Sequence, residues 1–123
     1  MTYNIHMDRR KFPRYNFKVH TQITTPEFYI TVNTIEISVE GIRAKAYSEI
    51  KPRTEVTISF NLKRELFFYG KVIWVIAFQR KDILKYMMGI KINAIVLSGA
   101  KVTGFNDKDE LIQDILTEFK KSE

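Results

Sequence analysis

Two short runs of sequence are the most informative about the fold: Asp8-Arg9-Arg10-Lys11-Phe12-Pro13-Arg14 and Glu36-Ile37-Ser38-Val39-Glu40-Gly41. The first gathers basic residues beside a proline, which can neither continue a helix nor sit inside a central strand. The second follows two strand-like runs and offers a carboxylate, a hydroxyl and a glycine, so we expect it to turn a corner at a strand end. Guanidinium groups suit phosphates and base edges, and a carboxylate suits a base that donates hydrogen bonds. The two runs together therefore predict a receptor for a nucleotide.

The rest of the chain alternates apolar and polar residues with the period of β-strands. Phe17 to Thr24 is the first such run, and Phe28 to Ile37 resumes the pattern as the second strand of a hairpin. Further strands are predicted over residues 41–46, 55–62, 66–78 and 86–92. A bulge or bend is expected at Gly70, inside the fifth of these six runs. Six strands joined by short turns predict an all-β fold, a six-stranded antiparallel β-barrel.

The C-terminal tail has helical periodicity instead. Asp107 is expected to cap the helix while Glu110 reaches back to the first turn. The apolar positions that share one helical face are Leu111, Ile112, Ile115, Leu116 and Phe119. We therefore expect a flexible arm over residues 1–16, a barrel over 17–105, and a C-terminal α-helix over 106–121 that packs on the barrel.

Composition limits the classes of function. The 123 residues are 45% hydrophobic, which suits one domain with one core. The net charge of +6 attracts polyanions without choosing among them. The absence of cysteine excludes disulfides and thiol catalysis and fits a reducing compartment. No secretory or membrane-spanning segment is visible, so the protein is predicted to be cytoplasmic, without membrane insertion.

Signals for catalysis, metals and cofactors are weak. His6 and His20 have no carboxylate or second ligand at metal-like spacing, so both are interpreted as ordinary surface histidines. There is no phosphate-binding glycine loop and no nucleophile elbow. We expect no enzyme activity, no metal and no cofactor. Most of the aromatic residues in strand patterns are predicted to be core: Trp74, Phe60, Phe67, Phe68 and Phe78.

Arg10-Lys11-Phe12-Pro13-Arg14, followed by Glu36-x-Ser38-x-x-Gly41, resembles the PilZ domain, whose signature is Arg-x-x-x-Arg and then Asp or Asn-x-Ser-x-x-Gly. Gly70-Lys71-Val72-Ile73-Trp74 resembles the family's Gly-x-Val-x-Trp strand, and Met88-Gly89-Ile90-Lys91-Ile92 its closing strand. The resemblance covers roughly residues 8–92. It implies a six-stranded barrel that binds the bacterial second messenger cyclic di-GMP.

The resemblance also implies roles for single residues. Arg10 and Arg14 would hold phosphates and guanine edges, and Arg9 would add a phosphate or stacking contact. Ser38 would bond the ligand and Gly41 would leave room for it.

Glu36 departs from the signature, which has Asp or Asn at this position. It keeps the charge and adds a methylene, so the ligand is either accommodated, shifted or no longer bound. Our interpretation is a stand-alone cyclic di-GMP receptor whose arm orders over the ligand and signals to an unidentified effector protein in trans. One alternative is a degenerate PilZ-like adaptor for motility or pilus machinery that binds no nucleotide. A second, less favoured, is a small basic barrel for single-stranded nucleic acid, which needs exposed aromatics along a basic groove.

Overall fold

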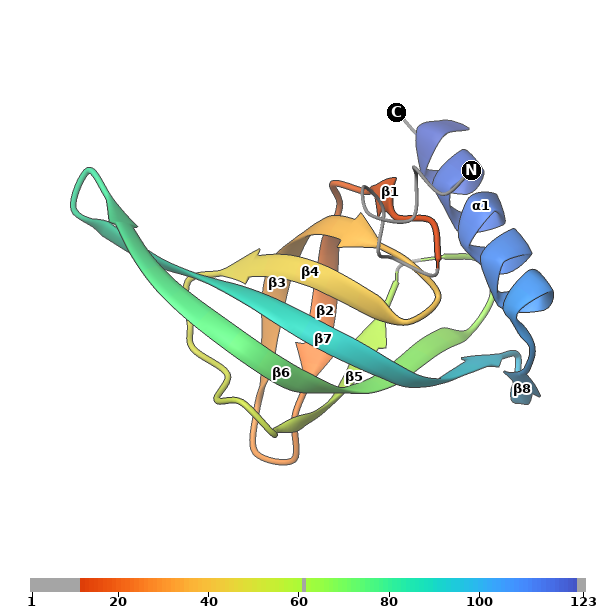
Figure 1. The fold of residues 1–123 in the computed structure, drawn as a ribbon, viewed down its shortest axis with the longest axis horizontal. Coiled ribbons are helices and arrows are strands. Elements are labelled where there is room, and N and C mark those ends of the chain that lie inside the picture. The colour runs from red at the N-terminus through yellow and green to blue at the C-terminus, as the bar shows by residue number, and fades with distance from the viewer. Residues whose placement is uncertain (1–11, 61, 122–123) are drawn as a thin grey trace, which may run out of the picture.

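The protein is a closed β-barrel with one helix packed across it, as the computed structural model shows for residues 12–60 and 62–121 (Figure 1). The elements in chain order are β1 Tyr15–Asn16, β2 His20–Thr24, β3 Tyr29–Ile37, β4 Gly41–Ala46, β5 Glu55–Ser59, β6 Leu66–Arg80, β7 Ile83–Leu97, β8 Ala100–Val102 and α1 Phe105–Lys121. The barrel runs β3-β2-β5-β6-β7-β4 and closes where β4 returns to β3, with every pair antiparallel. The predicted fold class, a six-stranded antiparallel barrel with a C-terminal helix, is confirmed. Two short strands extend it, β1 on β3 and β8 on β7.

Alternation along the strands fills the barrel with apolar side chains. In β2 the odd-numbered positions are buried and the even-numbered ones are exposed, and β5 buries Val56 and Ile58 in the same way. Ile23, Ile58 and Phe68 are completely buried. The period of two in the sequence is therefore the direct cause of the two faces of the barrel wall.

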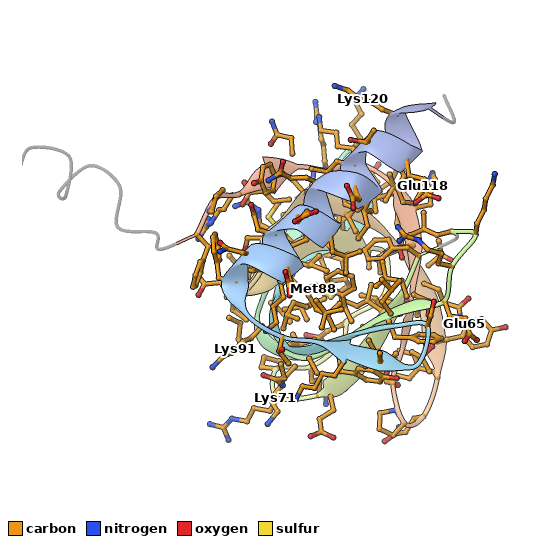
Figure 2. The ribbon with its side chains drawn as sticks, turned by 90° about the vertical axis from the view of Figure 1, so that its right-hand side faces the viewer. Glu65, Lys71, Met88, Lys91, Glu118 and Lys120 are labelled. Carbon is orange, nitrogen blue, oxygen red and sulfur yellow. The ribbon has the colours of Figure 1, made fainter. Side chains whose placement is uncertain are left out.

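Helix α1 crosses the barrel and contributes its apolar face to the same core (Figure 2). Leu111, Ile112 and Ile115 are buried, and the Phe119 ring packs edge-on against Phe17 at a centroid distance of 5.3 Å. Among the described residues, no helix is long and apolar enough to cross a membrane.

The helix α1 begins earlier than the sequence predicted, and this changes the position of Asp107 in it. The helix begins at Phe105, and the Gly104 carbonyl accepts the first helical hydrogen bond, from the Lys108 amide at 3.2 Å. Gly104 has a φ of +84°, which a residue without Cβ adopts without strain. Asp107 therefore lies inside the first turn, where its charge complements the helix dipole, and the prediction that it caps the helix is wrong.

The residues that precede β2 are held against the helix. The Phe12 ring stacks on Phe105 at 5.1 Å, and the Tyr15 hydroxyl donates to the Asp109 carboxylate at 3.0 Å. Desolvation, together with the hydrogen bond to Asp109, raises the pKa of Tyr15. The chain is thus tied to the barrel from Phe12 onward, earlier than the predicted boundary at residue 16. Residues 1–11 of the predicted arm lie outside the described part.

Strands β6 and β7 form a hairpin of 15 residues on each side that projects well beyond the barrel (Figure 1). It is longer than the two predicted strands, because Lys81 and Asp82 make a two-residue turn with φ of 51° and 65°. The ladder shifts register beside Gly70, as expected, and again between Val72 and Trp74. Gly70 is required there, since a Cβ would stand 2.3 Å from the Lys91 carbonyl oxygen.

Replacing Ile115 tests how far the helix belongs to the core. Ile115 is fully buried, so we expect Ile115→Ala to lower the free energy of unfolding by about 2–5 kcal/mol through lost transfer energy and a cavity. Denaturant unfolding measures it. The neighbouring Asp114→Ala, at an exposed position, should stay close to the parent. An Ile115→Ala protein as stable as the parent would contradict a helix that shares the barrel core.

Candidate functional site

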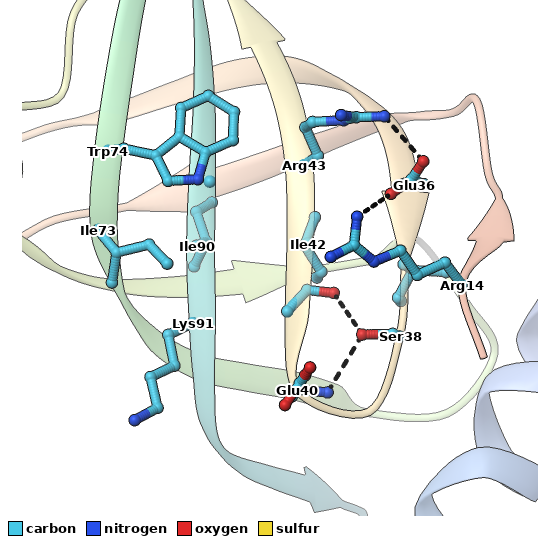
Figure 3. A pocket seen from close by; sticks show the side chains of 13 residues that line it. Arg14, Glu36, Ser38, Glu40, Ile42, Arg43, Ile73, Trp74, Ile90 and Lys91 are labelled. Carbon is cyan, nitrogen blue, oxygen red and sulfur yellow. Dashed lines mark hydrogen bonds and ion pairs between the residues drawn. The ribbon is translucent and has the colours of Figure 1, made fainter. Parts of the chain in front are cut away.

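One cross-strand row of residues on the barrel wall forms the floor of a pocket. Glu36 on β3 lies opposite Arg43 on β4, Arg43 lies opposite Gly89 on β7, and Gly89 lies opposite Trp74 on β6. Residues directly opposite in antiparallel strands share one face of the sheet. A pocket of about 380 Å³ lies along this row and also includes Arg14 and the corner between β3 and β4 (Figure 3).

Arg14 is placed at the pocket by β1. Tyr15 pairs with Ile37 and Asn16 pairs with Glu36, so the residue just before β1 reaches the end of β3. The Arg14 Nη1 group donates to Glu36 Oε1 over 3.4 Å, a long contact, and the Arg14 side chain is 43% exposed. Arg14 is therefore loosely held and accessible to a ligand.

Arg43 holds the other oxygen of the same carboxylate. Its Nη2 donates to Glu36 Oε2 over 2.7 Å, and the Glu36 side chain is only 19% exposed. The buried Nε of Arg43 has no hydrogen-bond partner among the described residues. Both Glu36 oxygens thus face guanidinium groups, one at close range and one at long range.

Arg43 was absent from the residues predicted from sequence, although a signal existed. It stands two residues after Gly41 on β4, and a period of two places both residues on one face of the strand. Any strand that begins at Gly41 therefore directs Arg43 toward the same pocket.

Ser38 and Gly41 build the corner between β3 and β4. The Ser38 amide donates to the Gly41 carbonyl at 2.9 Å, and the Ser38 hydroxyl accepts from the Glu40 amide at 3.3 Å. A Cβ on Gly41 would stand 3.0 Å from the Ile90 carbonyl oxygen. Both residues line the pocket and also shape the turn, so their presence has a structural reason beside the predicted contact with a ligand.

Trp74 does not belong to the core, so the prediction from sequence is wrong at this position. Val72 is fully buried, but the additional residue Ile73 in the β6 ladder shifts the alternation, and Trp74 lies half-buried in the pocket wall. Its indole packs over Gly89, where a Cβ would be 2.2 Å from the ring nitrogen. Phe60 and Phe68 are core as predicted. Nothing in the sequence indicated the bulge at Ile73, so period counting alone put Trp74 on the wrong face.

Four of the six predicted site residues come together at this pocket: Arg14, Glu36, Ser38 and Gly41. Arg9 and Arg10 lie outside the described residues. Within residues 12–60 and 62–121, no group of three or more acidic, histidine or cysteine side chains is arranged to hold a metal ion.

The sequence profile of the PilZ domain matches residues 8–99, which is most of the chain. The chain belongs to the PilZ domain family. A similar solved structure is the K. pneumonia MrkH–c-di-GMP complex, with a TM-score of 0.63 and 13% sequence identity. The alignment covers 94% of this chain and 56% of the MrkH chain, so this protein spans little more than half of that relative. No curated protein matches the chain in sequence.

The PilZ signature and this structure can be compared residue by residue. The Arg-x-x-x-Arg run ends at Arg14, and the second run begins at Glu36, so an ion pair joins the two motifs of the signature. Glu36, which stands where the signature has Asp or Asn, also forms an ion pair with Arg43 on the neighbouring strand β4.

The contact between Trp74 and Gly89 can be tested with the intrinsic fluorescence of the protein, because Trp74 is the sole tryptophan. We expect Gly89→Ala to push the indole out of its half-buried position, since the added methyl would overlap the ring. The emission should shift to longer wavelength and become easier to quench with iodide. Asn33→Ala, at an exposed position of β3, is the control. Unchanged emission in Gly89→Ala would show that the indole does not lie over Gly89.

Proposed function

We propose that this PilZ domain is a cyclic di-GMP receptor. The observation that carries the proposal is that Arg14 meets Glu36, Ser38 and Gly41 at one pocket, although Arg14 and the other three come from separate parts of the sequence. Membership of the family and the structural similarity to a protein solved with c-di-GMP support the same ligand. The pocket volume of about 380 Å³ is in the range of small-molecule sites.

Arg14 is the residue best placed to take a phosphate of the ligand. Its guanidinium is 43% exposed and its contact with Glu36 is long, so little is lost when it turns away. A guanidinium can bind a phosphate with two parallel hydrogen bonds, which adds both energy and direction.

Glu36 is proposed to accept hydrogen bonds from the donor edge of guanine. Both of its oxygens are occupied in the free protein, so the base must replace a partner. The long bond from Arg14 is the weaker of the two, whereas Arg43 holds Oε2 at 2.7 Å. Ligand binding would therefore release Oε1 in the same step in which Arg14 moves to a phosphate. Arg43 would keep the carboxylate oriented throughout.

The finer parts of the proposal concern residues 1–11 and a partner. Arg9 and Arg10 would close over the ligand as this segment orders, and the changed surface would be recognised by an effector protein in the bacterial cytoplasm. The receptor itself would carry out no chemistry. One observation favours a second candidate, an adaptor that binds no nucleotide: Glu36 already has both oxygens paired without a ligand.

Arg14→Ala separates the two candidates. We expect it to weaken cyclic di-GMP binding by about 2–4 kcal/mol, since it removes a charge-assisted contact, while the melting temperature barely changes because Arg14 is exposed. Calorimetric titration with cyclic di-GMP, beside GTP, measures it. Arg64→Ala is the matched control, because Arg64 pairs with Glu118, away from the pocket. A parent that binds no nucleotide would support the adaptor, whereas an Arg14→Ala protein that binds as well as the parent would show that Arg14 does not hold the ligand.

Substitutions of Glu36 test the contact with the base. We expect Glu36→Ala to lose about 1–3 kcal/mol of binding, because the guanine donors would go unpaired. Glu36→Asp should bind as well as the parent or better, by up to about 1 kcal/mol, because a shorter side chain loses less rotamer entropy. The same titration reads out both variants. Glu36→Ala binding as tightly as the parent would show that this carboxylate does not contact the base.

A further inference from the structure

The projecting hairpin leaves a long edge of β6 open. On the side away from β7, β6 pairs with β5 only as far as Lys71, and Val72 bonds with Arg53 and Thr54. From Ile73 to Arg80 the β6 backbone hydrogen-bonds to β7 alone, among the residues that the structure describes. Figure 1 shows this part of the hairpin extending away from the barrel.

The composition of this edge is unusual for a strand exposed to water. The run Ile73-Trp74-Val75-Ile76-Ala77-Phe78-Gln79 contains neither a charge nor a proline. Ile73 and Ile76 are 54% and 58% exposed. Soluble proteins normally protect such edges with lysine, proline or a covering segment, since unpaired amides and carbonyls invite another strand. A ribbon of two strands is also only marginally stable by itself in water.

We propose that the protein forms a homodimer in which the β6 edges of two copies pair in antiparallel fashion. The two hairpins would then make one four-stranded sheet, in the order β7-β6-β6-β7. This pairing satisfies the free backbone groups from Ile73 to Arg80 and covers part of the exposed apolar surface. A two-fold axis needs a self-complementary patch, and a strand edge without charges meets that condition without like-charge repulsion.

The residues at the two ends of the open β6 edge select the register of the pairing. Pairing centred on Ala77 sets Ile76 opposite Phe78 and Trp74 opposite Arg80 of the second copy. Apolar side chains then meet in the middle, and a guanidinium lies beside an indole at each end, a favourable cation–π arrangement. Pairing centred on Ile76 instead would set Arg80 opposite Val72, whose edge is already occupied by hydrogen bonds with Arg53 and Thr54.

The chosen register also connects the dimer with the pocket. Trp74 lines the pocket wall, so Arg80 of the second copy would stand next to the site. The pairing itself does not depend on nucleotide binding, and it can be tested on the ligand-free protein.

The absence of cysteine makes cross-linking a clean test. In the proposed register Ala77 lies opposite itself across the two-fold axis, with Cβ atoms about 4.5–5.5 Å apart, close to the separation that a disulfide spans. We expect Ala77→Cys to form a disulfide-linked dimer under mild oxidation much faster than Thr24→Cys, an exposed strand position elsewhere on the barrel. Equal rates for the two variants would overturn the register and the proposal.

Sedimentation of the unmodified protein supplies the second measurement. The parent should sediment as a dimer, and Ala77→Lys should weaken the dimer by on the order of tenfold or more, because it places two like charges directly opposite. Ala77 is exposed, so this variant should keep the melting temperature of the monomeric fold. A parent that stays monomeric over its soluble concentration range would overturn the proposal, as would a dimer that is indifferent to Ala77→Lys.

Discussion

Closure of the barrel through β4 is the constraint on which the pocket depends. β4 hydrogen-bonds to β3 along one edge and to β7 along the other, and it thereby brings the first third of the chain beside residues 73–91. The row from Glu36 through Arg43 and Gly89 to Trp74 exists only in the closed barrel. Because hydrogen-bonded strands lie about 5 Å apart, these side chains are fixed next to one another by backbone pairing and need no flexible loop to meet.

Gly89 and Trp74 shape this wall of the pocket. Gly89 has no side chain, so the Trp74 indole lies directly on the β7 backbone, and both residues line the pocket together with Arg43. The carboxylate of Glu36 lies in a partly buried place, and two guanidinium groups face it. Ion pairs of this kind cost desolvation energy, so their net contribution to stability is small. Their larger effect is on orientation, since Oε2 is fixed by Arg43 and Oε1 is free to exchange partners.

Much of the fold was readable from the sequence, because apolar alternation dictates which face of each strand is buried and Gly70 marked an irregular ladder. Four of the site residues predicted from the two motifs line one pocket in the structure. The hairpin turn at Lys81–Asp82 could not be predicted, since neither residue is the glycine or asparagine that usually marks two positive φ angles. The outward turn of Trp74 was equally hidden, because one additional residue, Ile73, reverses the alternation without any change in composition.

The bulge at Ile73 joins the pocket to the projecting hairpin. It lies where β6 leaves β5, so the same irregularity directs Trp74 into the pocket wall and starts the open edge. A second copy paired along β6 would therefore also restrain Trp74 in the pocket wall. β6 and β7 are joined by an unbroken ladder from Trp74 to Arg80, so this restraint would be carried by backbone hydrogen bonds. The pocket wall and the proposed dimer contact thus lie on one continuous hydrogen-bonded ladder.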